Sequence, residues 1–133
     1  MRIADAQPDL GEARSLAALA FSLVARCARA IDEGKPVIWQ PHRMIEENLW
    51  RAIRWGLSGE MIDLRSGDVR STRAAIEELI EWVMPVAEEL GAAPYLAVPE
   101  QNSAERQIAR FEEGASLQEI YTELVKGSER VGG

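Results

Sequence analysis

The chain has 133 residues and a mass of 14.8 kDa, the size of one domain. Apolar residues make up 47% and charged residues 28%, as in folded proteins and unlike disordered ones. Fifteen basic and 22 acidic residues give a net charge of −7, which excludes the basic surface that nucleic acids or anionic membranes require. One cysteine excludes an internal disulfide, and one histidine excludes a zinc cage of His and Cys ligands.

The most apolar run, residues 16–25, is too short to span a membrane. It is preceded by Asp5, Asp9 and Glu12, where a secretory signal would carry Lys or Arg. We therefore expect a buried helix face in a cytoplasmic protein that has no membrane partner.

The first helix is predicted to begin at Asp9, with Glu12 completing a capping box, and to end at Gly34. Its apolar face is predicted to comprise Leu16, Ala20, Leu23, Val24, Cys27 and Ile31. A second helix is expected from Pro41, a residue favoured at the first helical position, to Gly56. Its apolar face is predicted to comprise Ile45, Leu49, Ala52 and Ile53.

Between residues 60 and 70 short apolar pieces flank a turn, which favours a small hairpin. Ser71 or Thr72 is then predicted to cap a third long helix, kinked at Pro85 and closed by Gly91. Its apolar residues are Ile76, Leu79, Ile80, Val83, Val86 and Leu90.

Two further capping boxes, Asn102 with Glu105 and Ser116 with Glu119, predict helices that end near Gly114 and Gly127. We expect residues 128–133 to be frayed. The predicted fold is therefore all-α, a single helical domain over residues 1–133. Its five to six helices pack as an orthogonal, bundle-like layer, with one small β-hairpin near 60–70.

Few residues point to chemistry. His42 and Glu46 lie one turn apart and could bind a metal, but no third ligand is evident, so we interpret them as a solvated helix start. Cys27 has no basic partner that would activate a nucleophile, and we expect it to pack in the core. The paired glutamates are interpreted as solvated helix faces, with an ion pair between Glu47 and Arg51. The sequence thus predicts neither a catalytic set nor a metal site.

The segment from Glu47 to Leu57 is the most unusual, with two tryptophans, two arginines and an asparagine in three turns. Trp50 and Arg54 are one turn apart and could stack as a cation–π pair. The arginines could bind an anion, with Asn48, Arg51 and Trp55 on the flank opposite Ile45 and Ile53. The alternative is that the tryptophans fill the core while the arginines form salt bridges.

Four segments resemble, in order, the C-terminal region of the second glutamate–cysteine ligase family, the bacterial carboxylate–amine ligase branch of the glutamine-synthetase-like superfamily. Residues 2–8 (RIADAQP) resemble the end of a core strand and its turn. Residues 47–57 (ENLWRAIRWGL) resemble the family's Glu-Asn-Arg-Trp-Arg-Ala stretch with its Arg-aromatic-Gly ending, although Leu49 replaces an Arg. Residues 60–67 resemble the hairpin that follows, and residues 103–107 (SAERQ) are similar to the signature Ala-Asp-Arg-Gln, with Glu105 in place of Asp.

The resemblance implies that the sheet carrying ATP, magnesium and glutamate in the family lies N-terminal to this region. Arg2 would point from that sheet toward the nucleotide or the substrate carboxylate, and Asp5 would fix the strand end. The helical wall against the sheet would be lined or buttressed by Asn48, Trp50, Arg54, Arg106 and Gln107, with Gly56 in structural support. Nothing in the sequence supplies metal ligands, so the isolated chain is expected to need no cofactor, whereas a complete family enzyme implies ATP and Mg²⁺.

We therefore expect the C-terminal helical portion of an ATP-dependent carboxylate–amine ligase, inactive alone. A helical layer without its sheet would expose an apolar face, which predicts self-association or pairing with a sheet-bearing chain. One alternative is a non-catalytic helical interaction module derived from that family. Another is a small-molecule binder that uses Trp50 and Arg54.

Overall fold

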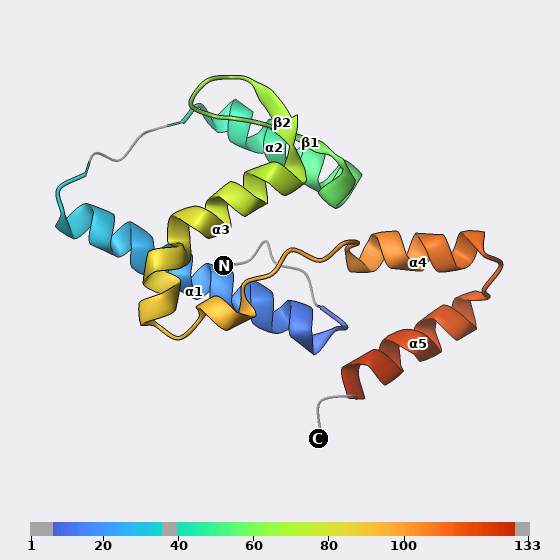
Figure 1. Ribbon diagram of the computed structural model, residues 1–133. Coiled ribbons are helices and arrows are strands. Elements are labelled where there is room, and N and C mark those ends of the chain that lie inside the picture. Colours follow the sequence, from blue (N-terminus) through green and yellow to red (C-terminus); the bar gives the residue numbers. More distant parts are fainter. Residues whose placement is uncertain (1–6, 36–39, 130–133) are drawn as a thin grey trace.

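The computed structural model describes residues 7–35 and 40–129 (Figure 1). Arg2 and Asp5 lie outside the described residues. Within these ranges the chain forms five α-helices, two 3-10 turns and one two-stranded sheet, which confirms the mainly helical fold class. The elements are α1 (Leu10–Asp32), α2 (His42–Trp55), η1 (Gly56–Ser58), β1 (Glu60–Ile62), β2 (Val69–Ser71), α3 (Thr72–Glu89), η2 (Ala93–Tyr95), α4 (Ser103–Glu112) and α5 (Leu117–Glu129).

The starts of α1, α3, α4 and α5 agree with the sequence, because a nearby polar side chain caps each of these four helices. The Asp9 carboxylate accepts a hydrogen bond from the Glu12 amide at 2.9 Å, but Glu12 does not complete the predicted capping box, because its carboxylate pairs with Arg106 instead. Ser71 Oγ accepts a hydrogen bond from the Ala74 amide at 3.2 Å. The first residue of α2 is His42, since Pro41 is its N-cap rather than its first helical residue. Both late capping boxes form, around Asn102 with Glu105 and around Ser116 with Glu119.

The best-buried part of the chain lies where α3 crosses α1, next to η2 (Figure 1). Small residues form it: Ala18 of α1, Ala87 of α3 and Ala92, with Val83 and Val86 fully buried beside them. Small side chains allow the two helices to approach closely. Pro85 lies inside α3, and Figure 1 shows the axis of this helix changing direction in its second half, as expected where a proline removes a backbone hydrogen bond.

A second packing unit forms where α2 contacts β1. Strands β1 and β2 pair antiparallel with Met61 opposite Arg70, as the predicted hairpin requires. The loop between the strands is closed by the Asp63 amide donating to the Asp68 carbonyl at 2.7 Å. The hairpin leads directly into α3, so it ties α2 to the α1–α3 core.

Helices α4 and α5 form an arm that extends from the α1–α3 core (Figure 1). The segment that leads to this arm is held to α1 by Ser15, whose Oγ donates to the Ala97 carbonyl at 2.9 Å and accepts from the Ala97 amide at 3.1 Å. Helix α5 ends at Glu129, near Gly127 as predicted, so residues 128 and 129 are helical rather than frayed; residues 130–133 lie outside the described chain.

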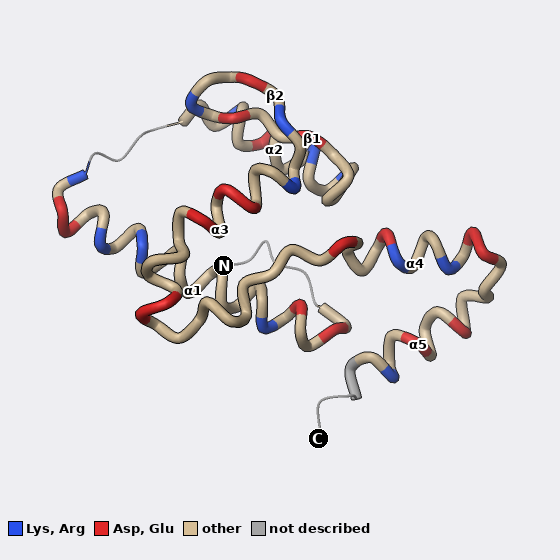
Figure 2. Tube along the Cα trace, in the orientation of Figure 1, with Lys and Arg blue, Asp and Glu red and all other residues tan. Residues whose placement is uncertain are grey.

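Two expectations about buried faces are wrong. Cys27 is exposed, as are Val24 and Ile31, because the core-facing side of α1 carries Ala18 and Ser22 instead. In α2, Ile45, Leu49 and Ile53 are exposed, because this helix turns its opposite side toward the hairpin. Figure 2 shows Lys and Arg interspersed with Asp and Glu along the chain rather than gathered on one element.

Candidate functional site

Asn48 fastens α2 to the hairpin. Its Nδ2 donates to the Ile62 carbonyl and its Oδ1 accepts from the Ile62 amide, both at 2.8 Å. The side chain thus pairs with the outer backbone edge of β1 as a neighbouring strand would. On the same side of α2, Arg51 Nε donates to Glu47 Oε1 at 2.8 Å, which confirms the predicted ion pair. The sequence predicted that Asn48 and Arg51 lie on the flank of α2 opposite its apolar face. In the structure this flank is the side of α2 that packs on the hairpin.

Trp50 and Arg54 lie on α2 without the expected stacking. The Trp50 ring meets Trp55 edge to face, with ring centroids 4.8 Å apart and an interplanar angle of 83°. Trp50 is 51% exposed, and Arg54 is also exposed, with no ion pair to any described residue. The cation–π contact in the described part of the chain instead joins Arg26 of α1 to Trp82 of α3, at 5.1 Å. Arg54 therefore presents an uncompensated positive charge beside an exposed tryptophan.

Gly56 brings the two family-like segments together. It ends α2 with φ of +56°, a conformation that side chains disfavour. A Cβ at this position would collide with Asn102 Nδ2 and lie 3.4 Å from Glu105 Oε1. The end of the segment 47–57 thus sits against the N-terminal cap of α4, where the segment 103–107 begins. The two segments are nearly fifty residues apart along the chain, so the sequence alone did not predict this contact.

A cavity of about 460 Å³ opens beside this junction. Its lining includes Ser58, Arg73 and Glu105. Arg73 Nη2 donates to the carbonyls of Pro99 and Glu100, each at 2.8 Å, and so fixes the segment that precedes α4. Glu105 Oε1 is shielded from solvent and has no hydrogen-bond partner among the described residues. Arg73 could not be predicted from the sequence, because an arginine in the first turn of a helix forms no recognisable pattern.

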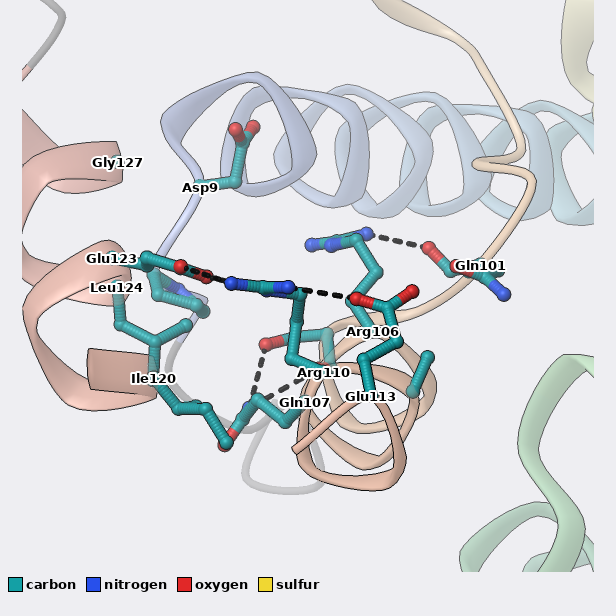
Figure 3. Close-up of a pocket in the computed structure, with 13 residues that line it drawn as sticks. Asp9, Gln101, Arg106, Gln107, Arg110, Glu113, Ile120, Glu123, Leu124 and Gly127 are labelled. Atoms are coloured by element: carbon teal, nitrogen blue, oxygen red, sulfur yellow. Dashed lines mark hydrogen bonds and ion pairs between the residues drawn. The ribbon is translucent and has the colours of Figure 1, made fainter. Parts of the chain in front are cut away.

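Arg106 and Gln107 line a second cavity, of about 410 Å³, between the start of α1 and the α4–α5 arm (Figure 3). Arg106 Nη1 donates to Glu12 Oε1 at 2.6 Å and to the Gln101 carbonyl at 2.5 Å. This hydrogen bond to Glu12 raises the pKa of Arg106. Gln107 Nε2 donates back to the carbonyl and the hydroxyl of Ser103, at 3.1 Å each. Arg106 therefore holds the arm to α1, and Gln107 stabilises the first turn of α4.

Arg110 is the second cation that lines this cavity and was not singled out from the sequence. Figure 3 shows its guanidinium between Glu113 and Glu123, with Nη1 at 2.7 Å from Glu113 Oε2 and Nη2 at 2.8 Å from Glu123 Oε1. The hydrogen bond to Glu123 raises the pKa of Arg110, and the same bond lowers the pKa of Glu123. An anion entering this cavity would have to displace carboxylates already paired with Arg106 and Arg110.

The described residues do not fit a metal ion. His42 Nδ1 lies 3.3 Å from Glu46 Oε2, and both side chains are exposed in the first turn of α2. Over residues 7–35 and 40–129, no three His, Cys, Asp or Glu side chains converge on a point that could hold a cation. No helix in the same ranges is long and apolar enough to cross a membrane.

Comparisons with known proteins agree with the resemblance seen in the sequence. The family model "Glutamate-cysteine ligase family 2 (GCS2)" matches residues 1–129. Three similar proteins, each named "Putative glutamate–cysteine ligase 2", come from Leifsonia xyli, Gloeobacter violaceus and Solibacter usitatus. They are 38%, 34% and 32% identical, over 93%, 96% and 96% of this chain, and the matches cover 34%, 36% and 34% of the relatives. The chain thus spans about a third of the length of these relatives. No solved structure matches it.

Proposed function

Because the chain belongs to glutamate–cysteine ligase family 2, we propose that it is the helical portion of an ATP-dependent carboxylate–amine ligase and that it is inactive alone. One observation carries this proposal. The two segments that most resemble the family, 47–57 and 103–107, meet where Gly56 packs on the cap of α4. If both segments belong to the core of the family's fold, they should pack against each other, as they do here.

The reaction of such a ligase phosphorylates a substrate carboxylate and then lets an amine displace phosphate. That chemistry needs metal ions and preorganised positive charge. The described residues offer no metal site, so ATP and Mg²⁺ would be held by the remaining two-thirds of a family chain. That region is the sheet-bearing partner in this proposal, and we place the assembly in the cytoplasm without nucleic-acid or membrane partners.

The residues of this chain divide into two roles. Asn48, Gly56, Arg106 and Gln107 hold the helical wall together, because their polar groups or close contacts are already committed within the chain. Arg54 is exposed and has no carboxylate partner among the described residues. It is therefore the cation of the helical wall that is best placed to meet a substrate carboxylate or a phosphate, beside the exposed face of Trp50.

The test is phosphate release from ATP with glutamate and cysteine present. We expect no turnover from the purified chain, and turnover when it is co-expressed with the unmatched two-thirds of the Leifsonia xyli relative. Arg54→Ala should lower the turnover of that pair, while Arg43→Ala, an exposed arginine of the first turn of the same helix, should leave it unchanged.

Turnover by the chain alone would contradict the proposal. A pair that co-purifies without turnover, while the intact relative is active in the same assay, would favour the non-catalytic interaction module. The exposed apolar residues on α2 support that alternative. A thermal shift of the chain alone by glutamate or ATP, lost in Arg54→Ala, would instead favour a small-molecule site at Trp50 and Arg54.

A further inference from the structure

One carboxylate oxygen of the family-like segment 103–107 is buried without a hydrogen-bond donor. Glu105 Oε2 accepts from the Asn102 amide at 2.8 Å, which completes the cap of α4. Glu105 Oε1 is shielded from solvent and has no hydrogen-bond partner among the described residues. A carboxylate oxygen that is removed from water without gaining a donor destabilises a fold, so nearly all such oxygens in folded proteins are paired. The oxygen therefore points to a donor from beyond the described residues.

Two arginines close to Glu105 already have other partners. Arg73 lines the same cavity, but its Nη2 donates to two backbone carbonyls, each at 2.8 Å. Arg106 follows Glu105 along α4, but its Nη1 donates to Glu12 at 2.6 Å. Within the described part of the chain neither arginine binds the free oxygen. A cation that satisfies this oxygen has to come from elsewhere.

The cavity of about 460 Å³ at this junction suits a positively charged group. Among the described residues that line it, the two carboxylates of Glu100 and Glu105 face one cation, Arg73. Gly56 lies next to Glu105 Oε1 and has no side chain to cover it. A hydrogen bond from an ionised donor to a carboxylate is roughly twice as strong as one between neutral groups. Lysine or arginine would therefore bind the oxygen better than a hydroxyl or an amide.

We propose that this cavity receives a lysine or arginine side chain of the sheet-bearing region, which donates to Glu105 Oε1. The matches cover about a third of the relatives, so about two-thirds of each relative has no counterpart in this chain. The cavity lies where the two family-like segments, 47–57 and 103–107, meet at Gly56. The sheet-bearing region is itself part of the proposed function, on which this docking rests.

Glu105→Gln separates docking from capping. Glutamine at this position of a capping box still accepts from the Asn102 amide, but its NH2 group cannot accept a hydrogen bond from a cation. In the isolated chain the urea midpoint should stay unchanged, because Oε1 has no partner to lose. Glu119→Gln is the matched control, since Glu119 accepts from the Ser116 amide in the same kind of cap and does not line the cavity.

Binding is measured on the chain co-expressed with the unmatched two-thirds of the Leifsonia xyli relative. We expect the dissociation constant of the co-purified pair, followed by sedimentation on dilution, to rise roughly tenfold or more in Glu105→Gln. Glu119→Gln should leave it unchanged. Alanine substitution of each lysine and arginine of the two-thirds region then identifies the donor. Removal of the donor should weaken the pair by a similar factor with Glu105 and have no further effect with Glu105→Gln.

A pair that forms and turns over but is insensitive to Glu105→Gln would overturn the docking and leave the proposed function standing, as would a scan in which no basic residue couples to Glu105. Failure of the wild-type chain to bind the two-thirds region would overturn both. A lower urea midpoint for Glu105→Gln in the isolated chain would show that Oε1 is already satisfied there, which also overturns the docking. Thermal stabilisation of the isolated chain by free arginine, lost in Glu105→Gln, would assign the cavity to a small amine instead.

Discussion

The side-chain amide of Asn48 takes the place of a neighbouring strand at the free backbone edge of β1. Its NH2 group donates to the Ile62 carbonyl, and its oxygen accepts from the Ile62 amide. A carboxylate could only accept and an ammonium could only donate, so neither could satisfy the Ile62 amide and carbonyl together. The position therefore requires a side-chain amide, which carries both a donor and an acceptor. The family resemblance pointed to Asn48, but the reason lies in its contact with the hairpin.

Asn48→Ala should lower the free energy of unfolding by about 1–3 kcal/mol, because two half-buried backbone groups lose their partner. Urea unfolding followed by circular dichroism measures the change. Gln118→Ala on the exposed side of α5 serves as the control and should shift stability by about 0.5 kcal/mol or less. Equal stabilities of the two variants would show that water replaces the Asn48 amide at no cost.

Gly56→Ala should destabilise the chain more than Gly34→Ala. Both glycines have positive φ, +56° and +70°, so both substitutions carry the cost of that backbone conformation. Only at Gly56 does the new Cβ strike another group, the Asn102 amide, whereas the space around Gly34 is open. Thermal unfolding of the two variants isolates the collision, and equal melting temperatures would mean that α2 and the cap of α4 are not in contact.

At the scale of elements, helix ends were predictable and helix faces were not. Asp9, Ser71, Asn102 and Ser116 act on amides three residues away, so the sequence contains the whole interaction. Which side of a helix is buried depends on its neighbours. The apolar side of α2 was obvious from its pattern, yet the hairpin pairs with the polar side that holds Asn48.

The hairpin is tied to α3 by Glu78, which accepts hydrogen bonds from Arg70 and, at 2.8 Å, from Arg65. The bond from Arg70 is the main reason that the pKa of Glu78 lies below its usual 4.5. Between these two pKa values the folded chain binds fewer protons than the unfolded chain. The stabilisation is therefore complete above pH 4.5 and is lost as the pH falls through the lowered pKa.

Glu78→Gln should accordingly destabilise the chain at neutral pH and become equivalent to wild type at an acid pH below the lowered pKa of Glu78. Urea midpoints at the two pH values give the comparison. Glu77→Gln, at an exposed neighbouring position, should match wild type throughout. If the urea midpoint of Glu78→Gln stays below that of wild type by the same amount in acid, the effect comes from lost packing and not from the lost ion pairs.

At the scale of the whole molecule, burial is concentrated in one place. The fully buried Val83, Val86 and Ala87 all belong to α3, whereas α4 has no buried residue and α5 has Ile120. Local opening should therefore require less free energy in the arm than in the core.

Hydrogen exchange should show the slowest amides in the second half of α3 and faster exchange throughout α4, despite its complete capping box. Removing the ion pair with Glu12→Gln should speed exchange in α4 further, because Arg106 holds the arm to α1. Equal protection in α3 and α4 would mean that the arm is an integral part of the core.

By itself the sequence determined the helical class, the positions of most helix ends, the hairpin and the family, because all of these follow from local patterns. The contacts between distant segments were decided only by the tertiary structure. Arg106 was identifiable as an arginine of a family-like motif, but its partner Glu12 lies 94 residues away. The contact of Gly56 with Asn102 likewise joins segments that are far apart in the sequence. The exposure of Cys27 and Val24 also depends on which side of α1 the rest of the chain covers. Burial and pairing are properties of the neighbours that a residue acquires in the fold, and these are set by how whole helices pack.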